Sequence, residues 1–155
     1  WYTPGLSGDN TPSVYKNISG SPLNQVAHGE VALHGGPANQ LAVARLTLAT
    51  AGSYTVAGVF GQGDLGTVDL HILVNGSSAF SKLAASGDEA FNFGTTLGAG
   101  STIDFLVGTD GDYRWDSTPL SATVTATPVP EPATLSIAAA GALLGMARRR
   151  RSAKS

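Results

Sequence analysis

The sequence predicts an all-β protein, a jelly roll or β-sandwich of about eight antiparallel strands, followed by one short C-terminal hydrophobic helix. Short β-branched runs broken by Gly, Asn, Asp and Pro recur at roughly ten-residue spacing from residue 25 onward. No helical period appears before the last 27 residues. The composition, with 20 glycines and few charged residues, is typical of a secreted all-β domain with many tight turns.

The elements follow in order along the chain. Residues 1–24 are rich in Gly, Pro, Ser and Asn and show no period, so we expect an irregular lead-in. The β-sandwich is expected over residues 25–127, with strands at 25–33, 40–48, 53–60, 67–75, 78–83, 89–97, 101–107 and 120–126. Apolar residues occupy every second position from Val68 to Val74, which indicates a half-buried strand. Asn75-Gly76 follows at once and predicts a type I′ hairpin turn.

Residues 128–155 form a separate segment with three dissimilar parts. Its first part is the polar, proline-containing motif Val129, Pro130, Glu131 and Pro132. Proline fixes φ and removes a backbone donor, so this motif is expected to be extended. The stretch 133–147 carries no charge and is predicted to be a transmembrane helix. Its length of roughly 22 Å is less than the roughly 30 Å of a hydrocarbon core, which makes it a marginal anchor.

The third part, residues 148–155, is basic and begins with Arg148, Arg149, Arg150 and Arg151. By the positive-inside rule these arginines hold the C-terminus in the cytoplasm and place residues 1–132 across the membrane. The alternative interpretation is a short buried helix with a basic end.

The order of these parts resembles the PEP-CTERM sorting signal of Gram-negative bacteria over residues 129–151. The resemblance implies recognition by an exosortase, a membrane-embedded cysteine transpeptidase, and cleavage near Pro130-Glu131-Pro132. The protein would then be exported, held transiently in the inner membrane, and released or transferred to the cell surface or extracellular matrix. On this interpretation it is the substrate of the exosortase and contributes no catalytic residue to that reaction.

Charge and cysteine content exclude several function classes. Residues 1–132 contain eleven acidic and four basic residues, a net charge of −7, whereas the tail from Ala133 carries +5. Such an acidic domain disfavours nucleic acid as a partner. The absence of cysteine excludes disulfides, thiol chemistry and Cys-zinc sites. No signal peptide opens the sequence at Trp1, so we expect any secretory signal to have been removed or to lie outside it.

A second resemblance covers residues 25–126 and rests on Ala-Gly-Ser-Tyr-Thr-Val at 51–56 and Gly-Ser-Thr-Ile-Asp-Phe at 100–105. These strand-and-turn motifs resemble the galactose-binding-like jelly rolls that often precede PEP-CTERM tails. The resemblance implies the fold, and sugar binding only by analogy, because one fold hosts many functions.

Asp110, Asp112 and Asp116 concentrate carboxylates in a predicted loop around Gly111. Hard oxygen ligands near a tight glycine turn suit Ca²⁺, so these residues are a candidate calcium site. The alternative is an acidic turn in which Asp112 and Asp116 cap backbone amides.

Tyr113 and Trp115 lie in the same loop. Aromatic rings beside carboxylates form a sugar platform, since the ring faces stack on pyranose C–H groups and the acids accept hydroxyl hydrogen bonds. The alternative is that Trp115 folds inward and covers one end of the sandwich.

Catalytic motifs are missing. His28, His34 and His71 are scattered and form no metalloprotease motif, and no Gly-x-Ser-x-Gly sequence occurs. We therefore expect a non-catalytic surface or exopolysaccharide-matrix protein whose β-sandwich binds carbohydrate. The alternatives are a purely structural matrix protein without a small ligand and, less favoured, a small secreted hydrolase that depends on Asp112 or Asp116.

Overall fold

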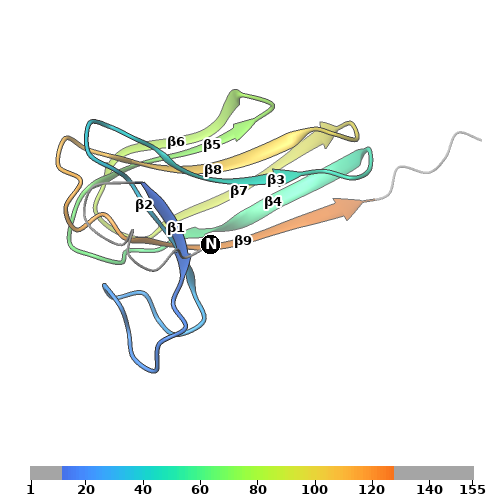
Figure 1. Ribbon diagram of the computed structural model, residues 1–155. Helices are drawn as coiled ribbons and strands as arrows, with labels where there is room; N and C mark the ends of the chain where they lie inside the picture. The colour runs from blue at the N-terminus through green and yellow to red at the C-terminus, as the bar shows by residue number, and fades with distance from the viewer. Residues whose placement is uncertain (1–11, 128–155) are drawn as a thin grey trace, which may run out of the picture.

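The computed structural model describes residues 12–127, which form two packed antiparallel β-sheets (Figure 1). The strands are β1 (Ser13–Lys16), β2 (Val31–His34), β3 (Ala42–Thr47), β4 (Gly52–Phe60), β5 (Val68–Val74), β6 (Ser77–Ala85), β7 (Glu89–Leu97), β8 (Thr102–Thr109) and β9 (Thr118–Thr127). One sheet has the order β1-β2-β9-β4-β7 and the other the order β3-β8-β5-β6. The predicted all-β jelly-roll class is confirmed.

The N-terminal part differs from the predicted pattern in two places. A short strand, β1, lies within the expected lead-in and pairs with β2. The strand predicted at 25–33 is wrong before Val31, because residues 23–30 form turns. Asn24 and Gln25 have φ values of 48° and 61°, which an extended strand does not allow. Residues 1–11 and the predicted helix 133–147 lie outside the described residues.

The core lies between the sheets and follows from the alternation of each strand. Apolar residues at every second position point inward, as β4 shows with buried Tyr54, Val56 and Phe60. Phe60 is fully buried and contacts Phe91 at 5.4 Å and Phe105 at 6.5 Å between ring centroids. These rings come from three strands in both sheets, so they join the two layers.

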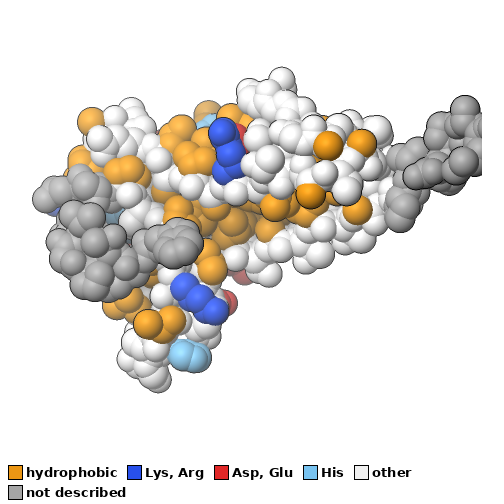
Figure 2. Space-filling view, turned by 45° about the vertical axis from the view of Figure 1, so that its right-hand side comes forward, with side chains coloured by type: hydrophobic (Ala, Val, Ile, Leu, Met, Phe, Trp, Pro, Cys, Tyr) orange, Lys and Arg blue, Asp and Glu red, His pale blue; other side chains and the backbone are white. Residues whose placement is uncertain are grey.

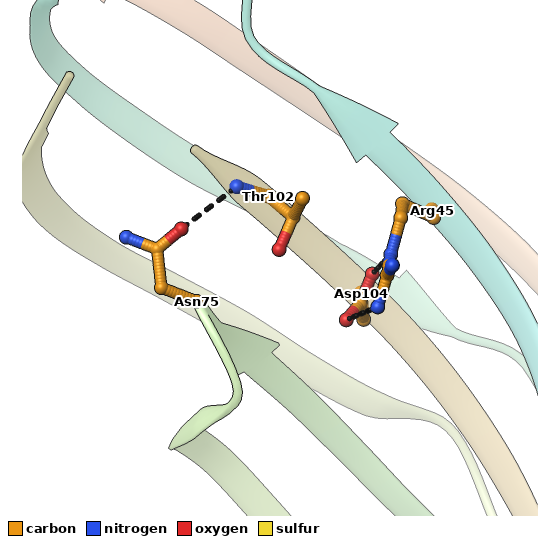
Figure 3. A network of polar contacts seen from close by, with 4 residues as sticks. All are labelled: Arg45, Asn75, Thr102 and Asp104. Atoms are coloured by element: carbon orange, nitrogen blue, oxygen red, sulfur yellow. Dashed lines mark hydrogen bonds and ion pairs between the residues drawn. The ribbon is translucent and has the colours of Figure 1, made fainter. Parts of the chain in front are cut away.

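The outer face of the four-stranded sheet carries an ordered polar network (Figure 3). Arg45 on β3 donates two hydrogen bonds to Asp104 on β8, at 2.6 Å and 2.8 Å. The Asp104 side chain is only 4% exposed, so the bidentate guanidinium compensates a carboxylate that is almost buried. The Asn75 side chain accepts a hydrogen bond from the Thr102 amide at 2.9 Å and joins the β5–β6 turn to β8.

The two ends of the sandwich are made of different loops (Figure 1). Thr127 ends β9 at one end, where it pairs with Ser53 of β4. The loop that leads into β9 lies at the other end, together with the β4–β5 loop. Each end therefore has its own set of side chains, and the candidate functional residues belong to the end where β9 begins.

Candidate functional site

Three loops meet at the end of the sandwich where β9 begins. They are the β4–β5 loop (61–67), the β6–β7 loop (86–88) and the β8–β9 loop (110–117). Asp64 and Gly66 donate backbone hydrogen bonds to the carbonyls of Ser117 and Trp115, at 3.2 Å and 2.9 Å. Asp88 of the second loop accepts the amide hydrogen of Gln62 at 2.7 Å. The loops thus hold one another, although they are far apart in the sequence.

Trp115 is presented outward at this end. Its residue is 66% exposed, so the alternative in which it folds inward is wrong. Its φ of 65° lies in the left-handed region, which is strained for a bulky side chain. The Gly66 amide holds the Trp115 carbonyl, and a Cβ on Gly66 would lie 2.5 Å from that oxygen. The close approach of a glycine therefore fixes the strained backbone that displays the indole.

A shallow depression lies beside Trp115. The residues that line it come from all three loops and the strands next to them, and they include Gly61, Gln62, Asp64, Ser86, Gly87 and Ser117. The hollow itself is only about 10 Å³, room for roughly one water molecule, so a sugar ring would lie across it and against the indole. Polar side chains and an exposed indole beside a concave surface are the elements of a carbohydrate subsite.

Tyr113 is less exposed than Trp115. Its side chain is half-buried, and the ring contacts of the described residues include neither Tyr113 nor Trp115. The two rings are therefore not stacked on each other, and their joint role as a sugar platform stays a prediction. Trp115 is the more exposed of these two aromatic residues.

The three predicted calcium ligands lie in different environments. Asp110 is exposed and accepts a hydrogen bond from the Thr67 hydroxyl at 3.1 Å. Asp112 accepts the Arg114 amide hydrogen at 3.1 Å, which is the capping role of the alternative interpretation. Asp116 is fully buried, and neither of its carboxylate oxygens has a hydrogen-bond partner. Within residues 12–127, no three His, Asp or Glu side chains lie close enough together to hold a metal ion.

Burial gives Asp116 unusual electrostatics. Desolvation, followed by the charges of Asp112, Asp64 and Asp110, raises the pKa of Asp116 from 3.8 to about 7. The Tyr15 hydroxyl is also buried without a hydrogen-bond partner, and desolvation raises its pKa. Asp64 contributes to both shifts, so an acidic and incompletely paired polar region lies beneath the loops.

Sequence reasoning missed the β4–β5 loop. Gly61, Gly63 and Gly66 punctuate this loop, and three glycines within six residues mark a backbone that can approach another segment closely. A Cβ at Gly63 would lie 2.1 Å from the Ser117 carbonyl oxygen, which shows how tightly this loop packs against the β8–β9 loop. The glycine spacing was the available signal, but nothing local to the sequence identified the partner loop.

The sorting-signal residues Val129 to Pro132 and Arg148 to Arg151 lie outside the described residues. Among residues 12–127, no helix is long and apolar enough to cross a membrane.

Comparison with known proteins gives one assignment for the C-terminal segment. Residues 128–151 match the PEP-CTERM protein-sorting motif. The predicted resemblance of this segment is confirmed, and the motif marks an exported protein that an exosortase processes and sorts to the surface or extracellular space. No curated protein matches the chain.

Solved structures with similar folds include proteins of different kinds. A family 35 carbohydrate binding module from an environmental isolate is 19% identical, over 81% of this chain and 96% of that one, with a TM-score of 0.44. The CBM36-1 domain of a multidomain xylanase from the hindgut metagenome of Trinervitermes trinervoides is 16% identical, over 76% and 92%, with a TM-score of 0.46. Rabbit GITRL is 13% identical, over 56% and 74%, with a TM-score of 0.43. Similarities at this level carry no argument about a ligand.

Proposed function

We propose that the protein is a non-catalytic component of the cell surface or exopolysaccharide matrix, and that its β-sandwich binds carbohydrate at the end that carries Trp115. The exposed indole beside a glycine-rich polar depression is the observation that supports this function. A bulky residue held at a positive φ is strained, and such strain often accompanies a binding role.

The chemistry of the site favours a neutral sugar. The indole face stacks on the C–H groups of a pyranose ring, and Gln62 and Ser86 supply polar groups at the depression. Asp110 and Asp112 are exposed in the same β8–β9 loop as Trp115 and can accept hydrogen bonds from sugar hydroxyls. The same carboxylates repel uronic acids and sulfated sugars, so we expect neutral glycans to bind better than anionic ones.

Replacement of Trp115 tests this proposal. The full chain and its Trp115→Ala variant are compared on a glycan array and by retention on surface polysaccharide. The matched control is Leu65→Ala, because Leu65 is also strongly exposed in these loops but has no ring. We expect loss of binding for Trp115→Ala, retention for Leu65→Ala, and partial retention for Trp115→Phe. Full binding by a folded Trp115→Ala variant would contradict the proposal and favour a purely structural matrix protein.

The sorting signal completes the proposal. Before cleavage, the apolar stretch 133–147 holds the protein in the inner membrane and the four arginines keep the C-terminus in the cytoplasm. Cleavage near Pro130-Glu131-Pro132 then separates the domain from its anchor. Mass spectrometry of the mature protein from its native host should find a new C-terminus close to this motif. The intact C-terminus on surface material would contradict it.

Calcium at Asp110, Asp112 and Asp116 stays a prediction. The two unpartnered oxygens of buried Asp116 support a cation there. The three side chains do not form a ligand cluster as they lie, so binding would require the loop to rearrange.

A further inference from the structure

The end of the sandwich next to Thr127 carries no charge. Its turns are residues 48–53, 75–78 and 97–102, none of which contains Asp, Glu, Lys or Arg. They belong to one surface, because the Leu48 amide bonds the carbonyl of residue 101 and the Asn75 amide bonds that of residue 102. Figure 2 shows no acidic or basic side chain on the right-hand part of the face that it draws.

The opposite end is acidic. Its loops carry five carboxylates and one basic side chain, Asp64, Asp88, Asp110, Asp112, Asp116 and Arg114. The charge of the domain is therefore distributed unevenly along its long axis, and the exposed Trp115 lies at the acidic end.

Strand β9 sets the distance between the two ends. Its ten residues run from the loop of Trp115 to Thr127, a rise of roughly 33 Å. Five residues, 128–132, separate Thr127 from the apolar stretch, and five residues can span at most roughly 18 Å. The connection to the membrane is thus shorter than the domain.

We propose that, while the tail anchors it, the domain stands on its uncharged end and presents the acidic Trp115 end away from the membrane. The partner of the Trp115 end is then a glycan of the surrounding medium or matrix, and not a headgroup of the anchoring bilayer. This inference rests on the proposed anchoring and sugar binding.

Length excludes an inverted arrangement. With the Trp115 end on the membrane, Thr127 would lie roughly 33 Å above it, beyond the reach of the five-residue connection. On an anionic leaflet, charge disfavours a tilted arrangement, because tilting brings the exposed carboxylates of Asp88, Asp110 and Asp112 within a Debye length of the lipid surface. The uncharged end meets the same surface without repulsion.

Energy transfer to lipid headgroups measures this orientation. The chain contains no cysteine, so Leu65→Cys and Ala99→Cys each create a single labelling position. Leu65 is 81% exposed at the acidic end, and Ala99 is exposed at the uncharged end. The full-length proteins carry a donor dye and are inserted into phosphatidylcholine vesicles that contain phosphatidylglycerol and a headgroup acceptor. Energy transfer is measured on the vesicle-bound protein alone.

We expect at least about twofold higher transfer from position 99 than from position 65, given labels separated by roughly the length of β9. A flexible Gly-Ser insertion after Thr127, longer than the domain, should reduce this difference. Equal transfer from both positions of the uninserted protein, or higher transfer from position 65, would overturn the proposal. Sugar binding is judged separately with Trp115→Ala, which should leave the transfer ratio unchanged. Failure of one inference is thereby distinguishable from failure of the other.

Discussion

Replacing Asp116 with Asn should make the domain more stable at neutral and alkaline pH. The replacement should also remove the pH dependence of stability that the titration of Asp116 causes. The Asp116 side chain is fully buried, and neither oxygen has a hydrogen-bond partner. Burial and three neighbouring acids raise the pKa of Asp116 to about 7 in the folded state, from 3.8. Below pH 4 the side chain is neutral in both the folded and the unfolded state and costs nothing extra.

Between pH 4 and pH 7 the unfolded state releases this proton while the folded state retains it. Stability therefore falls as pH rises through this window, and the full loss is present above pH 7. Three pH units correspond to about 4 kcal/mol, which water close to the loops screens to roughly 2–4 kcal/mol. That is a large part of the 5–15 kcal/mol that stabilises a typical domain. Asn has the same shape and no charge, so Asp116→Asn avoids this loss.

Urea unfolding followed by circular dichroism at pH 4, 6 and 8 measures the difference between the two proteins. We expect almost no difference at pH 4 and a gain of roughly 2–4 kcal/mol for Asp116→Asn at pH 8. Asp88→Asn is the control, because Asp88 is exposed at the same end of the sandwich and is not among the charges that raise the pKa of Asp116. Two parallel pH profiles, or a less stable Asp116→Asn variant at pH 8 without metal, would refute the electrostatic reasoning.

Calcium gives the opposite signs. If Ca²⁺ binds here, a chelator should lower the melting temperature at pH 8, and Asp116→Asn should be destabilising because it removes a charged ligand. An unchanged melting temperature after chelation would contradict calcium binding at this loop.

Two further substitutions test the geometry of the loops and of the sheet face. Gly66→Ala places a Cβ 2.5 Å from the Trp115 carbonyl oxygen and 2.6 Å from Asp116 Oδ1, so it should lower stability by about 1–3 kcal/mol and weaken glycan retention. Gly98→Ala is the control, because its Cβ meets nothing within 4 Å and its φ is not positive, and it should leave retention unchanged. Unchanged retention by Gly66→Ala would show that the tight glycine contact does not position the indole. Arg45→Ala leaves the nearly buried Asp104 carboxylate unpaired and should cost about 1–3 kcal/mol at pH 7 by chemical unfolding, with partial recovery in the Arg45→Ala/Asp104→Asn double variant. A single variant as stable as the parent would show that water solvates Asp104.

The strands that were predicted well have strong local patterns. From Val68 to Val74 the alternation gave β5, and Asn75-Gly76 gave the turn to β6, with Asn75 and Gly76 at φ values of 49° and 81°. Strand β1 was missed because four residues carry too little period to be distinguished from a loop. It is a strand because β2 pairs with it, which is a long-range fact.

The candidate site shows the same division. The sequence singled out Asp116 and Trp115 by residue type and spacing. It did not predict which of the two side chains is buried and which is exposed. Asp116 is fully buried, whereas Trp115 is two-thirds exposed. This difference depends on contacts with Gly66 and Asp64, which lie in a loop about fifty residues earlier. No local pattern contains that pairing.

The sequence by itself determined the all-β class, the positions of most strands and the sorting signal, because each depends on neighbours in the chain: a period of two, a turn dipeptide, or three dissimilar parts in order. Only the tertiary structure decided which loops share an end, which carboxylate loses its water and which aromatic residue faces outward. The physical reason is that burial and charge interactions depend on distance in space, and β-sheet pairing brings together residues that the chain keeps far apart.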